Sequence, residues 1–262
     1  MGGKVKGHLS VVILAKNEER RIKKFLECMA GWCDEIVVVD DYSTDNTAKI
    51  CEEAGCKVVL RYSNLDFSAQ RNFGADAARG EWIFVSAPDE YISEGAKAKI
   101  EQALNNSDGA AAFQLLRKNF FLNQPIEHCG ATNWETRIYK KGLAHFEGTP
   151  HEKLIVKGDT GKIQAEIFHY AFDSVNQAIA TGNFYTEIEA DEFVRNINKI
   201  SYKEIRYNLT WKPLKLFWKL YIKKKGYKDG QCGLMWCILN VMGPEMRWLK
   251  ILEKAQKEGK LK

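Results

Sequence analysis

The chain of 262 residues is long for one ordinary domain and short for two, so a catalytic-sized domain with an appendage is expected. Apolar residues make up 45% and charged residues 28% of the composition, which excludes a disordered or collagen-like chain. The formal net charge of +5 hides an asymmetry, because residues 195–262 hold 17 Lys and Arg against 5 Asp and Glu. The body is acidic, so the basic tail is expected to meet an anionic partner.

The first hundred residues alternate between two hydrophobic periods. A continuous apolar run at residues 9–15 is typical of a strand buried on both faces, and further strands with apolar centres are expected at residues 35–40, 57–61 and 81–86. Helical spacing follows each run, at residues 18–29, 47–54, 67–78 and 92–104. This alternation predicts an α/β fold with a mostly parallel, Rossmann-like central sheet and helices on both faces.

The pattern changes after Gly109. Shorter strands are expected at residues 110–116 and 137–139, then a strand pair at 154–156 and 162–170 around a Gly-Asp-Thr-Gly turn. A long polar helix covers residues 173–197, and a basic amphipathic helix begins at Pro213. We therefore expect a catalytic domain at 1–195 and a basic helical C-terminal region at 196–262. Within the catalytic domain, residues 8–105 form the nucleotide-binding half and 106–195 the acceptor half.

Polar residues gather where the predicted parallel strands end, and ligands of such sheets bind beyond the carboxyl ends of the strands. Asp40 ends a buried strand, where a carboxylate needs a hydrogen-bond donor such as a base imide or a ribose hydroxyl. Alternatively, Asp40 or Asp41 caps the helix that follows Ser43. Asp41 fits both interpretations equally, and Asp40 fits ligand contact better.

Two further strand-end features are weak when taken singly. Asp89 and Glu90 follow the fourth strand, where two carboxylates can hold a hard cation against a diphosphate or simply begin a helix. Arg71 lies on the preceding helix and can bind a phosphate or form a surface salt bridge.

Together these segments resemble the family 2 nucleotide-sugar glycosyltransferases with the GT-A fold. The resemblance covers residues 8–105 in order and spacing. Its motifs are VVILAKNEE (11–19), VDDYSTDNT (39–47), QRNFG (70–74) and GEWIFVSAPDE (80–90).

Later segments resemble a narrower branch, the bacterial lipopolysaccharide-core glycosyltransferases, over most of the chain but more loosely. These segments are RKNF (117–120), HCG (128–130), RIYKKG (137–142), HE (151–152), HY (169–170) and the basic aromatic C-terminus.

The resemblance implies roles at matching positions. Asp40 is expected to contact the base of the nucleotide, Arg71 to lie near the diphosphate, and Asp89 to bind Mg²⁺ or Mn²⁺. The branch usually has Asp-Ala-Asp-Glu where this chain has Ala87-Pro88-Asp89-Glu90, so the first aspartate is missing and the need for a metal is open. Asn133 also replaces an aspartate that is usual in the branch. The residues expected to bind the donor are Ala15, Asn17, Glu18, Asp40, Asp41, Arg71 and Asp89.

Family 2 enzymes invert the anomeric centre, so the resemblance implies a carboxylate base for the acceptor hydroxyl. Glu152 is the first candidate and Glu135 the second, although either can be a surface carboxylate. His151 is a candidate ligand of the metal or the diphosphate. His128 and His169 are expected to be structural.

The basic C-terminal helix carries apolar residues on one side, among them Phe217, Trp218 and Tyr221, and six lysines including Lys215 and Lys219 on the other. This composition is typical of a helix at a membrane interface, or of a helix packed on the body with a solvated rim. No motif for binding nucleic acid accompanies the basic charge.

We expect an inverting transferase that moves a hexose or heptose from a nucleoside diphosphate sugar, UDP-sugar first, to a saccharide acceptor. The acceptor is expected to be lipid-linked, in the lipopolysaccharide core or a similar glycan, and the enzyme to sit peripherally on the inner face of the cytoplasmic membrane. The alternatives are a weakened GT-A scaffold that binds nucleotide or glycan, and a nucleotidyltransferase.

Overall fold

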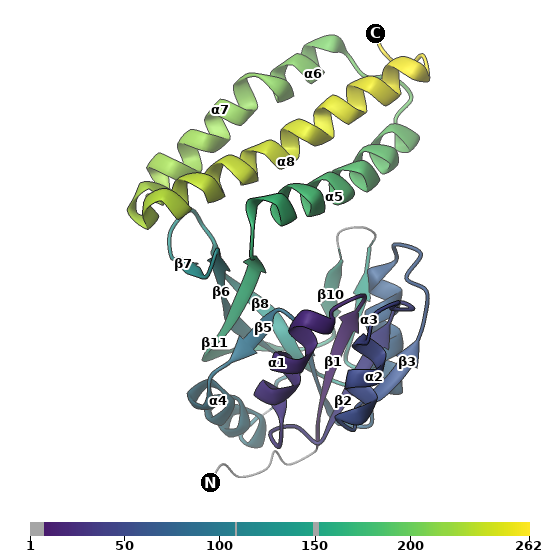
Figure 1. Cartoon of the computed structure of the whole chain (residues 1–262), viewed down its shortest axis with the longest axis vertical. Helices are drawn as coiled ribbons and strands as arrows, with labels where there is room; N and C mark the ends of the chain where they lie inside the picture. Colours follow the sequence, from purple (N-terminus) through teal and green to yellow (C-terminus); the bar gives the residue numbers. More distant parts are fainter. Residues whose placement is uncertain (1–7, 108, 149–151) are drawn as a thin grey trace. The chain divides into compact units, whose positions relative to one another are not determined.

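The structure is a computed structural model that describes residues 8–107, 109–148 and 152–262. Its first half alternates strands and helices as expected (Figure 1). The strands β1, β2, β3 and β4 are all parallel, in the spatial order β3-β2-β1-β4. The elements of this half are β1 (Leu9–Ala15), α1 (Glu19–Met29), β2 (Glu35–Asp40), α2 (Thr47–Glu53), β3 (Lys57–Leu60), α3 (Phe67–Ala77) and β4 (Trp82–Ser86).

The sheet continues from β4 into strands of mixed direction. The full spatial order is β3-β2-β1-β4-β8-β6-β11-β5, with β7 on β6, and β10 and β9 form a separate hairpin. β8 is antiparallel to β4, and β5 is antiparallel to β11. The added elements are β5 (Glu90–Ile92), α4 (Glu94–Asn105), β6 (Ala112–Phe121), β7 (Gln124–Ile126), β8 (Thr132–Lys140), β9 (Ala144–Glu147), β10 (Lys153–Val156) and β11 (Thr160–Phe172).

The α/β class and the helices on both faces are confirmed, while the second half of the sheet is mixed rather than parallel. The expected pairing of residues 154–156 with 162–170 is wrong, because β10 pairs with β9 and β11 pairs with β5. The fourth helix also begins later than expected. Ile92 belongs to β5, and the Ser93 hydroxyl accepts a hydrogen bond from the Ala96 amide, which caps α4.

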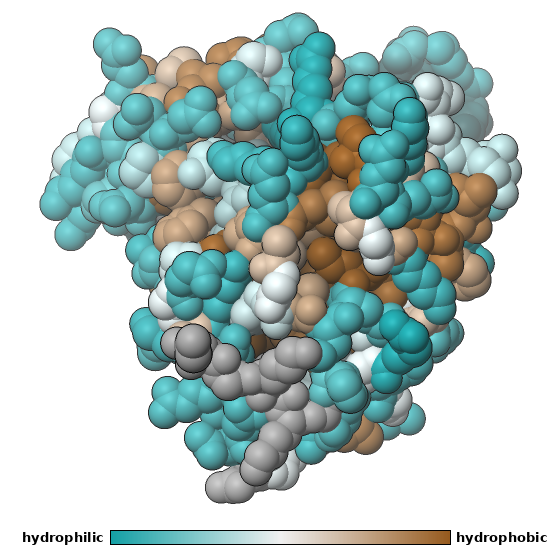
Figure 2. All heavy atoms as spheres, turned by 60° about the horizontal axis from the view of Figure 1, so that its bottom comes forward, coloured by the Kyte–Doolittle hydropathy of each residue, from teal (hydrophilic) through white to brown (hydrophobic). Residues whose placement is uncertain are grey.

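The two faces of the parallel strands bury different partners. Val11, Ile13 and their neighbours pack against the apolar sides of α1 and α4, with Phe25 and Ile100 fully buried. On the other face, Val12 and Val85 pack with α3 and with apolar side chains of the β9–β10 hairpin. The face drawn in Figure 2 also shows apolar patches among the polar side chains that dominate it.

The chain divides into two compact units, and the boundaries fall within β6, at the start of β8 and near the end of β11. Unit 1 comprises residues 1–117 and 133–169, and unit 2 comprises residues 118–132 and 170–262. The division differs from the expected boundary after residue 195, because the long helix α5 packs on α8 within unit 2.

Unit 2 is mainly helical. Figure 1 shows α8 running beside α5 on one side and beside α6 and α7 on the other. Trp248 and Ile251 of α8 are buried with Ala190 and Val194 of α5. No helix in the described residues is long and apolar enough to cross a lipid bilayer. The helical elements are α5 (Val175–Asn196), α6 (Tyr202–Leu209), α7 (Trp211–Phe217), the π-helix η1 (Trp218–Lys223), the short 3₁₀ helix η2 (Gly226–Asp229) and α8 (Gly230–Lys257).

Candidate active site

The carboxyl ends of β1, β2 and β4 lie at one edge of the sheet. Ala15, the buried last residue of β1, is in register with Asp40 at the end of β2. Ser86 ends β4 on the other side of β1, and Asp89 follows it. Because β1 lies between the other two strands, the ends of β2 and β4 are about 10 Å apart. Ala15, Asp40 and Asp89, which come from separate segments and are expected to bind the donor, therefore share one edge. Ligands of such sheets bind at this edge.

Asp40 is almost fully buried, and its own loop satisfies it. One carboxylate oxygen accepts a hydrogen bond of 2.8 Å from the Ser43 amide, and the other accepts one of 2.5 Å from the Ser43 hydroxyl. These bonds close a turn within the loop. The capping alternative is wrong for Asp40, because α2 begins at Thr47 and its N-cap residue is Asn46. Each carboxylate oxygen has a second lone pair, so these contacts leave acceptor capacity for a ligand.

Asp41, directly after β2, links the segments that follow β1 and β3. Its carboxylate accepts hydrogen bonds from Lys16 Nζ at 2.9 Å and from the amide and hydroxyl of Ser63. Burial alone would raise the pKa of Asp41, but these donors outweigh it and hold that pKa below its ordinary value. Asp41 therefore stays an anion at neutral pH.

The loop after β1 is fastened to the loop after β2 and to the start of α2 by two residues that the sequence assigned to the donor, Asn17 and Glu18. The Asn17 side chain accepts a hydrogen bond of 2.8 Å from the Thr44 amide, and the Glu18 amide donates one of 2.8 Å to the Thr47 hydroxyl. Asn17 adopts a left-handed conformation with φ of 55°. Both residues shape the edge that carries Asp40.

The QRN motif aims Arg71 by fixing the residues on either side of it. The side-chain amide of Gln70 donates to the Arg61 carbonyl, and the Asn72 side chain exchanges two hydrogen bonds with the backbone of Phe146. Gly74, one turn later, lets α3 approach the sheet, since a Cβ there would lie 2.6 Å from a methyl of Val12. These contacts hold α3 against the central sheet and against β9.

Arg71 and both candidate bases line one cavity. It has a volume of about 690 Å³, and Arg71, Glu135 and Glu152 all face it. Arg71 Nε donates a hydrogen bond of 3.0 Å to Glu152, and its guanidinium lies 5.5 Å from the centre of the Phe146 ring. The other lining residues are Val85, Arg117, Thr136, Arg137, Phe146, Lys153, Leu154 and Ile155.

A second ion-pair network reaches this cavity from Glu90. Glu90 is almost fully buried and lies 2.5 Å from Arg137 and 3.2 Å from Arg117. Both guanidinium groups also contact Glu135, at 2.8 and 3.2 Å. Burial would lower the pKa of Arg137, but the two carboxylates outweigh it and raise that pKa. Sequence reasoning did not assign either arginine a role, although each is the first residue of a quoted motif, RKNF (117–120) or RIYKKG (137–142).

Asp89 lies against a histidine that was expected to be structural. The Asp89 carboxylate is 3.3 Å from His169 Nε2 and 3.7 Å from the Arg21 guanidinium. Burial would raise the pKa of Asp89, but the hydrogen bond from His169 and the positive charges of His169, Arg21 and Arg117 together outweigh it and lower that pKa. Antiparallel pairing places His169 opposite Glu90, next to Asp89. His128, in contrast, pairs with Asp229 at 2.7 Å in unit 2.

His151, the other candidate metal ligand, lies outside the described residues. Within the described part of the chain, no group of three or more His, Cys, Asp or Glu side chains is arranged to hold a metal. A cation at Asp89 would therefore have two protein ligands and would need a bound phosphate or water to complete its coordination.

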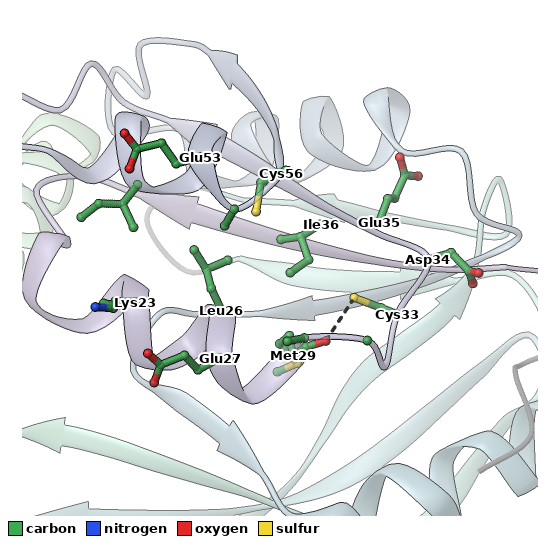
Figure 3. A pocket seen from close by; sticks show the side chains of 15 residues that line it. Lys23, Leu26, Glu27, Met29, Cys33, Asp34, Glu35, Ile36, Glu53 and Cys56 are labelled. Carbon is green, nitrogen blue, oxygen red and sulfur yellow. Dashed lines mark hydrogen bonds between the residues drawn. The ribbon is translucent and has the colours of Figure 1, made fainter. Parts of the chain in front are cut away.

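A second cavity, of about 700 Å³, lies at the opposite end of β2 (Figure 3). Its walls come from α1, from α2 and from residues leading into β2, and include Leu26, Ile36 and Cys33. Burial raises the pKa of the Cys33 thiol to about 12, and this thiol donates to the Met29 carbonyl. The cavity is lined by no residue of the carboxyl edge.

The residues proposed for membrane or acceptor contact are divided by the structure. Phe217 and Tyr221 stack on each other with ring centres 5.3 Å apart and pack against a buried cluster of unit 2. Trp218 is exposed, as are Lys215 and Lys219.

Several relatives of this chain carry the name glycosyltransferase. An uncharacterised glycosyltransferase of Rickettsia conorii is 28% identical, over 95% of this chain and 91% of that protein. The lipopolysaccharide core biosynthesis glycosyltransferase LpsC of Rhizobium meliloti is 23% identical, over 87% of this chain and 85% of its own.

Some solved structures are similar to this chain at lower sequence identity. Mannosyl-3-phosphoglycerate synthase from Rubrobacter xylanophilus has a TM-score of 0.48 at 11% identity, covering 67% of this chain and 70% of that one. Glucosyl-3-phosphoglycerate synthase from Mycobacterium tuberculosis, in complex with Mn²⁺, UDP and glucosyl-3-phosphoglycerate, has a TM-score of 0.38 at 19% identity, covering 52% and 58%.

The family model described as glycosyl transferase family 2 matches residues 10–161, which is more than half of the chain. The match spans the carboxyl edge of the sheet, the QRN motif and the cavity that Arg71 faces. This chain belongs to glycosyltransferase family 2.

Proposed function

We propose that this protein is an inverting glycosyltransferase that moves a hexose or heptose from a nucleoside diphosphate sugar, UDP-sugar first, to a saccharide acceptor. One observation carries the proposal: a single cavity gathers Arg71, Glu135 and Glu152. The name of the relative LpsC supports an acceptor of the lipopolysaccharide-core type, which is lipid-linked.

The donor would bind along the carboxyl edge. Asp40 and Asp41 would accept hydrogen bonds from the base and the ribose, on a surface shaped by Ala15, Asn17 and Glu18. Arg71 donates to Glu152 through Nε. The four Nη hydrogens would then donate to a second partner such as a diphosphate oxygen. The guanidinium would then link the donor to the candidate base.

Asp89 and His169 fit a divalent cation as a pair. Neighbouring ligands of one cation, each about 2.1 Å from it, lie about 3 Å apart, and the two side chains are 3.3 Å apart. A carboxylate oxygen and an imidazole nitrogen suit Mn²⁺, and Mg²⁺ is held by one or two carboxylates plus phosphates. When bound, the cation would neutralise charge on the departing diphosphate. Ala87 offers no oxygen ligand, and His151 stays a prediction.

Glu152 is the proposed general base. It would take the proton of the acceptor hydroxyl while that oxygen bonds to the anomeric carbon and the bond to the diphosphate oxygen breaks, its electron pair leaving with the nucleoside diphosphate. Glu135 suits this task less, because two guanidinium groups already contact its carboxylate. Its place would be to hold Arg117 and Arg137 at the cavity.

Calorimetric titration with UDP, other nucleoside diphosphates and their sugars, with and without Mn²⁺, tests the donor site. We expect binding of at least one nucleoside diphosphate, and release or transfer of sugar from the matching donor. The absence of a heat signal with every nucleotide would contradict the donor site. Binding without any release of sugar would favour the scaffold alternative, which the substitution at Ala87 motivates.

We further propose that the enzyme acts peripherally at the cytoplasmic face of the membrane, where a lipid-linked acceptor would be presented. Support comes from the basic charge of residues 195–262 and from the exposed Trp218.

A further inference from the structure

Four large apolar side chains form an exposed stripe along α7 and η1. Trp211 and Leu214 are each 64% exposed, and Trp218 and Ile222 are 51% and 46% exposed. Their spacing of three, four and four residues places them on one side of a continuous helical segment. We call these four residues the tryptophan stripe.

The other side of the same segment packs against the rest of unit 2. Pro213 is buried, and Phe217, Leu220 and Tyr221 pack against the cluster that contains Phe121. The segment thus has its own core contacts, and the tryptophan stripe is additional apolar surface. Phe217 and Tyr221, which sequence reasoning assigned to the membrane, belong to the core side.

The surroundings of the stripe are strongly basic. Residues 205–228 contain one arginine and seven lysines and no acidic residue. Lys215 and Lys219 are exposed on the same segment, and Lys223 Nζ lies 4.7 Å from the centre of the Trp218 ring. Exposed apolar side chains on a segment whose only charged residues are cations complement a surface that is anionic outside and apolar beneath.

We propose that the tryptophan stripe inserts into the headgroup layer of an anionic membrane, with the flanking lysines on the lipid phosphates. Indole rings favour the membrane interface because they are apolar with one N–H donor, and lysines reach from an apolar surface to the headgroups. A helix with an exposed apolar side and a basic flank lies in this plane. This inference rests on the proposed function, because docking would bring the enzyme to a lipid-linked acceptor.

Co-sedimentation with lipid vesicles tests the stripe. We expect the full chain to bind mixed phosphatidylcholine–phosphatidylglycerol vesicles, and to bind pure phosphatidylcholine vesicles about tenfold less. The triple variant Trp211→Ser/Leu214→Ser/Trp218→Ser should lose about tenfold or more of the anionic binding. Thermal unfolding should stay near that of the wild type, since the changed side chains are exposed.

Two further variants separate apolar insertion from charge and from general stickiness. Leu249→Ser removes an equally exposed leucine from α8 outside the stripe, and its vesicle binding should match the wild type. Lys215→Gln/Lys219→Gln should weaken binding to anionic vesicles and leave the weak binding to neutral vesicles unchanged. An equal loss in Leu249→Ser and in the triple variant would overturn the stripe as the docking surface.

The outcomes for docking and for catalysis are distinguishable. Nucleotide binding without vesicle binding would refute docking and leave the proposed function standing. Vesicle binding that depends on the stripe, without nucleotide binding, would refute the proposed function alone. Stripe-dependent self-association, or RNA binding in place of lipid binding, would likewise refute docking, because the stripe would then have another partner.

Discussion

The Oδ2 atom of Asp89 lies 3.3 Å from Nε2 of His169. Asp89 follows the last parallel strand, whereas His169 is on β11, which pairs with β5. The parallel and antiparallel halves of the sheet therefore each supply one member of the candidate cation pair.

We expect Asp89→Asn and His169→Ala each to weaken Mn²⁺-dependent UDP binding by about tenfold or more, because each removes one of two protein ligands. Calorimetry with Mn²⁺ and with a chelator measures the difference. His145→Ala, which changes a partly exposed histidine paired with Glu147, is the control. Unchanged affinity in both site variants would show that the pair holds no cation.

Glu152→Gln should lower kcat by about 10²–10⁴-fold with little change in donor affinity. The glutamine oxygen still accepts from Arg71 but takes no proton at neutral pH. Glu135→Gln makes the same chemical change in the same cavity, and its effect on kcat should be smaller. Steady-state transfer rates measure both variants, and the reverse order would assign the base to Glu135.

Gly74→Ala should destabilise the protein by about 1–3 kcal/mol. The new Cβ would lie 2.6 Å from a methyl of Val12 and 2.7 Å from one of Val39, so α3 would have to move away from the sheet. Gly95→Ala in α4 meets only the Ser93 hydroxyl at 3.9 Å and should stabilise by about 0.5–1 kcal/mol. Urea unfolding compares the two, and equal effects would contradict the close approach of α3.

Glu35 should make stability depend on pH. Burial would raise its pKa, but hydrogen bonds from Ser10 and Arg79 outweigh this and lower that pKa below the ordinary value of 4.5. A depressed pKa stabilises the folded state above the ordinary value, and this stability is lost as pH falls through the folded value.

Glu35→Gln should therefore unfold at a lower temperature than the wild type at pH 7, and the gap should close in acid. Thermal unfolding at a series of pH values measures it. Glu53→Gln, at an exposed residue with a loose partner 3.9 Å away, should show no such convergence. A gap for Glu35→Gln that stays constant into acid would contradict the assignment.

The parallel half of the fold was predictable because its signals are local. β1 and β2 have the predicted bounds, since each has an apolar run that gives way to charged residues, at Lys16 and at Asp40-Asp41. The antiparallel half was not, because β11 pairs with β5 through contacts between distant segments. No local pattern distinguishes β10 paired to β9 from β10 paired to β11.

The same limit applies to side-chain roles. No sequence pattern around His169 indicates that it contacts Asp89. Only the pairing of β11 with β5 brings the two side chains together. On α7 and η1, Phe217 and Trp218 are both apolar, and the cluster around Phe121 decides which of them is covered. Hydrophobic periodicity predicted an amphipathic helix but could not tell its two apolar sides apart.

The position of His169 on β11 also bears on how the protein matures. Antiparallel pairing with β5 brings His169 beside Asp89, so the pair can form only after β11 has been synthesised and docked. Contacts between distant segments form late in folding. Acquisition of Mn²⁺ would then report completion of the sheet, and a nascent chain stalled before β11 would carry the parallel strands but no cation pair.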